Sequence, residues 1–118
     1  MIVLLIRRFA RPGREAAFLS AFAAQRPVGN PDFLGETLTR IGDAAALPAG
    51  VPALLAPSEG ASSYLNIARW RSLAAFEREF AAQLAAPGGF CPETEVRRAE
   101  IAVLEIEAGA GPADAFAG

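Results

Sequence analysis

Asn66 and Trp70 are the residues whose types and spacing best suit the binding of a small molecule. Side chains alternate between the two faces of a strand, so in a strand over 63–70 Asn66 and Trp70 share one face with Tyr64. An asparagine in a central strand needs a hydrogen-bond partner, which is either a protein group or a ligand. The pattern predicts that Asn66 and Trp70 share one wall of a pocket. The alternative is that Trp70 is a core anchor that caps the following helix.

Two aromatic pairs on predicted helices can face the same sheet surface. Phe18 and Phe22 lie four residues apart on the first helix, and Phe76 and Phe80 lie four apart on the second. One interpretation is ordinary core, because aromatic stripes at helical spacing usually pack. The other is that these rings and Tyr64 are substrate-binding residues that line a flat, apolar slot for a small aromatic ligand.

Few residues can supply other catalytic chemistry. The chain has no histidine and one cysteine, Cys91, so no Cys/His zinc site, no other metal site and no histidine-paired nucleophile is expected. Arg97 or Arg98 is a candidate for stabilising a substrate anion, with a surface ion pair as the alternative. The candidates for a general base are glutamates, most of them expected to be solvated: Glu36, Glu77, Glu79, Glu100 and Glu105.

Six elements in the order strand, helix, strand, strand, helix, strand position these residues. Their expected ranges are 2–9, 13–25, 33–41, 63–70, 73–86 and 96–107. The order predicts an α+β fold, a ferredoxin-like βαββαβ antiparallel sheet with two helices on one face. The Pro- and Gly-rich segment 42–61 is expected to be a loop near the mouth of the cavity or a flexible insertion.

The first strand is apolar on both faces, although both helices of such a unit cover only one. A second copy packed sheet on sheet is the simplest cover, so a homodimer is expected. The two faces carry Ile2, Leu4 and Ile6 on one side and Val3, Leu5 and Phe9 on the other.

Length and charge exclude several classes of protein. The chain of 118 residues fits one domain, expected over 1–109 with a flexible C-terminal tail over 110–118. A formal net charge of −2 without blocks of like charge argues against nucleic-acid binding. The apolar start 1–6 is too short for a membrane span and has the wrong order for a signal peptide, so no membrane partner and a cytoplasmic location are expected.

Three blocks of the chain resemble the antibiotic biosynthesis monooxygenase family. They are FARPGRE at 9–15, PDFLG at 31–35 and YLNIARWRS at 64–72, the last followed by AFE at 75–77. In family order the matches cover roughly 2–107, and the resemblance implies the family's dimeric α+β barrel.

The resemblance implies catalytic roles for Asn66 and Trp70. Cofactor-free members that oxidise polycyclic phenols carry an Asn and a Trp at this separation on this strand. By resemblance, Asn66 would hydrogen-bond the substrate oxygen that becomes an oxyanion, and Trp70 would stack on the ring or donate its indole N–H. No cofactor is implied.

Three positions at which this chain differs from family members reduce the number of activities that the resemblance can imply. Haem-degrading members carry a histidine where this chain has Phe80, and an asparagine where it has Ile6; oxygenases carry a tyrosine where it has Phe76. The expected function is a cofactor-independent monooxygenase-like protein acting on a hydroxylated polycyclic aromatic or a quinol. The alternative, which Phe76 favours, is a non-catalytic small-molecule-binding protein of the same fold.

Overall fold

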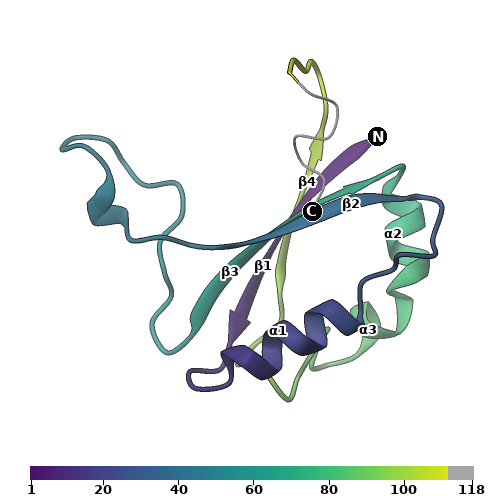
Figure 1. Cartoon of the computed structure of the whole chain (residues 1–118), viewed down its shortest axis with the longest axis horizontal. Coiled ribbons are helices and arrows are strands. Elements are labelled where there is room, and N and C mark those ends of the chain that lie inside the picture. The colour runs from purple at the N-terminus through teal and green to yellow at the C-terminus, as the bar shows by residue number, and fades with distance from the viewer. Residues whose placement is uncertain (112–118) are drawn as a thin grey trace.

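The structure, a computed structural model, describes residues 1–111 and contains one antiparallel sheet with helices on one face (Figure 1). In sheet order the strands are β2 (Phe33–Arg40), β3 (Ser62–Trp70), β1 (Ile2–Ala10) and β4 (Glu100–Glu105). The helices are α1 (Glu15–Ala24), α2 (Leu73–Glu79) and α3 (Ala81–Ala85). The predicted ferredoxin-like α+β fold is confirmed, and β1 and β3 are its central strands, each paired along both edges.

The second predicted helix is two short helices. Ser72 caps the first as predicted, because its Oγ accepts a hydrogen bond from the Ala75 backbone N–H at 3.2 Å. Between α2 and α3, Phe80 has φ −111° and ψ 23°, outside the helical region. No glycine or proline occurs at this point. The Phe80 ring packs against the rings of Trp70 and Phe76, and we attribute the interruption to this packing.

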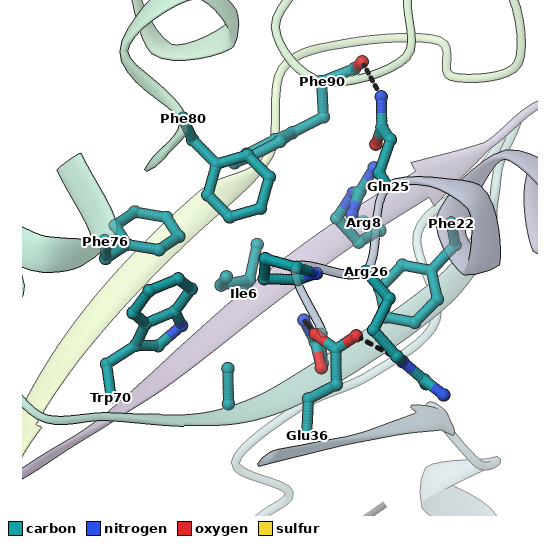
Figure 2. A pocket seen from close by; sticks show the side chains of 13 residues that line it. Ile6, Arg8, Phe22, Gln25, Arg26, Glu36, Trp70, Phe76, Phe80 and Phe90 are labelled. Atoms are coloured by element: carbon teal, nitrogen blue, oxygen red, sulfur yellow. Dashed lines mark hydrogen bonds and ion pairs between the residues drawn. The ribbon is translucent and has the colours of Figure 1, made fainter. Parts of the chain in front are cut away.

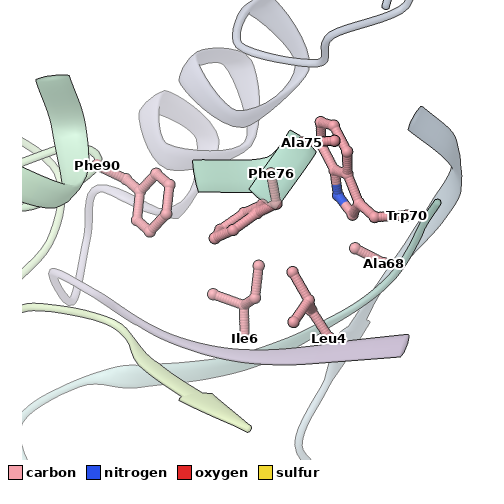
Figure 3. Close-up of a cluster of buried hydrophobic side chains, with 7 residues drawn as sticks. All are labelled: Leu4, Ile6, Ala68, Trp70, Ala75, Phe76 and Phe90. Carbon is pink, nitrogen blue, oxygen red and sulfur yellow. The ribbon is translucent and has the colours of Figure 1, made fainter. Parts of the chain in front are cut away.

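The core lies between the helices and the face of the sheet that they cover, called the inner face below. Alternation along β1 turns Leu4 and Ile6 to this side, and both are buried. Burial of each large apolar side chain contributes roughly 1.5–3 kcal/mol to stability. The cluster drawn in Figure 3 comprises Leu4, Ile6, Ala68, Trp70, Ala75, Phe76 and Phe90.

The opposite, outer face carries no helix. A hollow of about 590 Å³ lies on it, and its apolar lining includes Val3, Leu5, Ile67 and Leu104. All six residues of β4 are exposed in the single chain. The apolar outer face predicted for β1 is therefore present, with Val3 and Leu5 half-buried and Phe9 buried in one chain.

The connection 41–61 projects away from α2 and α3 (Figure 1) and contains one short 3-10 helix, Ala44–Ala46. Arg7 holds it, since Nη2 donates to the Ala56 carbonyl at 2.5 Å and to Ser58 Oγ at 2.9 Å. Arg7 lies on the outer face by the alternation of β1. None of the connection lines the inner cavity, so the prediction that it lies near the mouth is wrong for the single chain.

The last strand is shorter than predicted. Before β4, Glu95 forms an isolated bridge with Ala10, and the Val96 backbone N–H donates to the Phe9 carbonyl at 2.8 Å. This contact ties the segment to the end of β1, and the regular ladder begins only at Glu100. Residues 112–118 of the predicted tail lie outside the described residues. No helix in the described part is long and apolar enough to cross a membrane.

Candidate functional site

A small cavity lies between the inner face of the sheet and the helices (Figure 2). Its free volume of about 20 Å³ has room for roughly one water molecule. Ligand pockets typically measure roughly 300–1,000 Å³, so the open slot predicted for an aromatic ring is closed in this conformation. The lining residues are Ile6, Arg8, Phe22, Gln25, Arg26, Pro27, Glu36, Asn66, Ala68, Trp70, Phe76, Phe80 and Phe90.

Asn66 is buried in the wall of this cavity. It lies on β3 between Ile6 of β1 and Leu38 of β2. Its Nδ2 donates to Glu36 Oε1 at 3.1 Å, whereas its buried Oδ1 has no hydrogen-bond partner. The unsatisfied group is therefore an acceptor, while the predicted contact with an oxyanion needs a donor. The prediction that Asn66 donates to a substrate oxyanion therefore does not match this arrangement, in which the donor Nδ2 is already bound to Glu36.

Glu36 is the one predicted general-base candidate that lines the cavity. It is 7% exposed, and its Oε2 accepts from Arg26 Nε at 2.8 Å. The Arg26 side chain is partly open to solvent, so this ion pair lies at the edge of the cavity. The other candidates are exposed, as predicted: Glu77, Glu79, Glu100 and Glu105.

Trp70 is both a core residue and part of the cavity wall. It is 1% exposed and packs against Phe33, Phe76 and Phe80 with ring centroids 5.3, 5.7 and 6.2 Å away. No protein group in the described chain accepts a hydrogen bond from its indole N–H. Figure 2 shows the nitrogen-bearing edge of the indole turned toward the side of the cavity where Glu36 lies. This N–H is the donor that a ligand in the cavity can use.

A buried ion pair lies where the cavity approaches α1. Arg8 Nε donates to Glu95 Oε1 at 2.8 Å, and Nη2 donates to the same oxygen. The Arg8 guanidinium also lies 5.3, 5.7 and 4.8 Å from the ring centroids of Phe18, Phe22 and Phe90. Burial raises the pKa of the Glu95 carboxyl above its ordinary value, and the hydrogen bond and charge of Arg8 oppose that rise. Sequence reasoning missed this pair.

The structure brings most of the predicted site residues together. Those that line the cavity are Asn66, Trp70, Phe22, Phe76 and Phe80. Tyr64 and Phe18 do not line it; their rings stack on each other with centroids 5.0 Å apart, in a second core cluster with Ala10. For these two rings the alternative interpretation, ordinary packing in the core, is the one that applies.

The two arginines considered for anion stabilisation lie elsewhere. The Arg97 guanidinium is 3.9 Å from the centroid of the Phe9 ring. Arg98 Nη2 donates to the Leu84 carbonyl at 2.6 Å. Neither residue lines the cavity, and the cavity's own cations are Arg8 and Arg26.

The residues of the cavity do not fit a haem or a metal ion. No group of three or more His, Cys, Asp or Glu that could hold a metal ion occurs among residues 1–111. The chain has no histidine, and the ring of Phe80 packs between Trp70 and Phe90. The thiol of Cys91 donates to Gln25 Oε1 at 3.4 Å. With no histidine, with a phenylalanine at position 80 and with the Cys91 thiol hydrogen-bonded to Gln25, the wall offers no ready axial ligand for iron.

No family model matches the chain, and no curated protein matches it. Solved structures do match. An asparagine-to-alanine variant of SnoaB, a cofactor-independent oxygenase from Streptomyces nogalater, is 26% identical with a TM-score of 0.55, over 92% of this chain and 95% of SnoaB. The haem degrader MhuD from Mycobacterium tuberculosis, with two haems in its active site, is 20% identical with a TM-score of 0.57, over 94% of this chain and all of MhuD.

A third match is a Bordetella bronchiseptica protein with a provisional assignment as an antibiotic biosynthesis monooxygenase. It is 17% identical with a TM-score of 0.59, over 91% of this chain and 97% of its own. The chain has the fold of the antibiotic biosynthesis monooxygenases. The resemblance predicted from three sequence blocks is thereby confirmed. Because proteins of this fold include an oxygenase and a haem degrader, the chemistry of this chain has to be argued from its own site.

Proposed function

We propose that this chain is a cofactor-independent monooxygenase-like protein acting on a hydroxylated polycyclic aromatic or a quinol. The observation that carries the proposal is the unpartnered acceptor Asn66 Oδ1, in a cavity that is also lined by the indole of Trp70 and by four phenylalanine rings. An unpaired buried acceptor costs roughly 1–3 kcal/mol, which a ligand hydroxyl recovers by donating to it. The similarity to SnoaB supports the same reaction class.

In this proposal the chain binds and orients the substrate. The ring enters by displacing side chains that close the cavity, of which Arg26 is partly open to solvent and Phe80 lies at the junction of α2 and α3. It then lies against Trp70, whose indole N–H stabilises the oxygen that gains negative charge. The hydroxyl that donates to Asn66 Oδ1 stays protonated. A second acidic oxygen of the ring system, at the indole N–H, supplies the anion, and its proton passes to solvent. The carbon of the electron-rich ring reacts with dioxygen, one oxygen atom entering the product and the other leaving as water, with all electrons supplied by the substrate.

Oxygen uptake with metal-free protein tests the reaction. Anthrones, naphthols and quinols form the panel, and Asn66→Ala and Trp70→Phe are the variants, the second chosen because it keeps a ring in the core. We expect uptake matched by product formation in the wild type and its loss in both variants. Uptake that is unchanged in both variants contradicts the proposed site.

The second candidate is a binding protein without catalysis. Phe76 favours it, since the tyrosine hydroxyl found there in the related oxygenases is absent, and its ring instead packs edge-on against Trp70 at 5.7 Å. Stoichiometric binding of an aromatic ligand without oxygen uptake identifies this function.

We also propose that a second copy covers the outer face. The hollow on this face has apolar side chains in its lining, and Val103, Leu104 and Ile106 are exposed in one chain. Monomeric proteins rarely expose a patch of this kind. Its position on the sheet rather than on a helix suits packing of sheet against sheet.

A further inference from the structure

We propose that Glu36 is a positioning residue that sets the hydrogen-bonding polarity of the site. It holds the Asn66 amide with Oδ1 left for the ligand, so that the site prefers a ring carrying a hydroxyl to the same ring carrying a methoxy group. This inference rests on the proposed function, because it names the group by which that site recognises its substrate.

The orientation of the Asn66 amide follows from its contact with Glu36. An ionised carboxylate has no proton to donate, so a neighbour 3.1 Å away must be a donor. Rotating the amide by half a turn would bring Oδ1 against Oε1 and place two acceptors at hydrogen-bonding distance without a proton between them. Arg26 Nε occupies the other carboxylate oxygen at 2.8 Å, which leaves Oε1 for Asn66.

Two other polar side chains of the cavity wall, Gln25 and Arg8, donate to groups other than Asn66. Gln25 Nε2 donates to the Phe90 carbonyl at 3.0 Å, and the Arg8 guanidinium donates to Glu95. Ile6, the neighbour of Asn66 on β1, has no polar side-chain atom. Asn66 Oδ1 is thus an acceptor that the described chain does not satisfy, although the residue is only 3% exposed.

A ligand hydroxyl supplies the missing donor, whereas a methyl ether of the same ring has no hydrogen to give. Leaving a buried acceptor unpaired beside a bound ligand predicts that the ether binds about 5- to 150-fold more weakly than the hydroxyl compound. Isothermal calorimetry without oxygen measures both affinities free of turnover, with 2-naphthol and 2-methoxynaphthalene as probes.

Glu36→Gln tests the positioning role with a side chain of the same shape. In this variant the glutamine amide can donate to Asn66 Oδ1 once the Asn66 amide has rotated by half a turn. Oδ1 is then no longer free for a ligand, so the ratio of the hydroxyl and ether affinities should fall to within about threefold of 1. Asn66→Leu, which removes the acceptor, is the second variant and should give the same ratio. Glu79→Gln is the matched control, because exposed Glu79 also accepts from an asparagine, Asn30, and its replacement should leave the wild-type ratio unchanged.

The side-chain amide signals of Asn66 in a ¹H–¹⁵N NMR spectrum give a second readout that needs no ligand. They should shift in Glu36→Gln and stay in place in Glu79→Gln. The inference is overturned if they do not respond to Glu36→Gln, or if the wild type binds the ether as tightly as the naphthol. A retained hydroxyl preference without any oxygen uptake overturns the proposed catalysis and supports this inference. Binding of neither compound overturns both.

Discussion

Replacing Arg8 by methionine removes one partner of the buried Arg8–Glu95 pair and leaves a carboxylate with almost no access to water. The two side chains are 4% and 1% exposed. Removing one partner of such a pair costs roughly 3–5 kcal/mol, because the other charge stays buried and unpaired. Methionine keeps much of the volume of arginine, and its sulfur can contact the surrounding phenylalanine rings. Against a total stability of about 5–15 kcal/mol for a domain, the expected loss is large.

The size of the loss depends on pH through Glu95. Burial raises the pKa of Glu95, and Arg8 opposes the rise, so removing Arg8 raises the pKa of the folded state further. A carboxyl with a higher pKa in the folded state takes up a proton on folding. Its contribution to stability is therefore fully present below the unfolded value of 4.5 and is lost as pH rises toward the folded pKa. Arg8→Met should be most destabilised, relative to the wild type, near neutral pH and less so near about pH 5.

Urea unfolding followed by Trp70 fluorescence measures the effect at a fixed protein concentration. The set is the wild type, Arg8→Met, Glu95→Gln and the double variant, each at about pH 7 and about pH 5. The double variant should be more stable than Arg8→Met at neutral pH, because it buries no unpaired charge. A loss in Arg8→Met that is equal at both pH values, or a double variant no more stable than Arg8→Met, refutes this reasoning.

Three other features give predictions. For the outer face, light scattering should give twice the chain mass, and Leu5→Asp should split the dimer or unfold it; a stable wild-type monomer contradicts the dimer. For the missing histidines, added haemin should give no sharp histidine-ligated Soret band and no haem breakdown under reductant, and a saturable complex that turns over contradicts this. For the cavity, a planar phenol should quench Trp70 emission saturably, and Asn66→Ala should weaken binding by roughly 1–3 kcal/mol; an unchanged affinity in that variant excludes Asn66 as a partner.

Strand alternation was enough to place Asn66 and Trp70 on one wall, because the β3 ladder with β1 runs without a shift from Ser62 to Trp70. Alternation along β1 likewise encodes the two apolar faces from which the dimer was predicted. These features are local, since each depends on residue types two positions apart on a regular strand.

The role of Glu36 depends on sheet register, which residue types do not specify. Glu36 lies two positions before Leu38 and so on the same face of β2, which means that a buried position could have been considered from the sequence. Its place opposite Ala68, however, follows from a shift in register between Phe33 and Gly35, where the glycine adopts φ 126°. The contact with Asn66 was therefore not predictable.

Arg8 shows the same limit for long-range contacts. By strand alternation it lies on the same face of β1 as the buried Leu4 and Ile6. A charged residue at the end of an apolar run is nevertheless expected at the surface unless a buried partner for it is known. The partner, Glu95, is 87 positions away. The helix break at Phe80 and the stacking of Phe18 on Tyr64 also depend on tertiary packing, which overrides helical periodicity.

A crystal structure with a bound hydroxyanthraquinone tests most directly whether the inner cavity is the substrate site. We expect the ring system to lie against Trp70, Phe80 or Arg26 to be displaced from its present position, and a ligand hydroxyl oxygen to lie within about 3.2 Å of Asn66 Oδ1. A ligand bound on the outer face, or one inside the cavity that makes no polar contact with Asn66, contradicts this expectation.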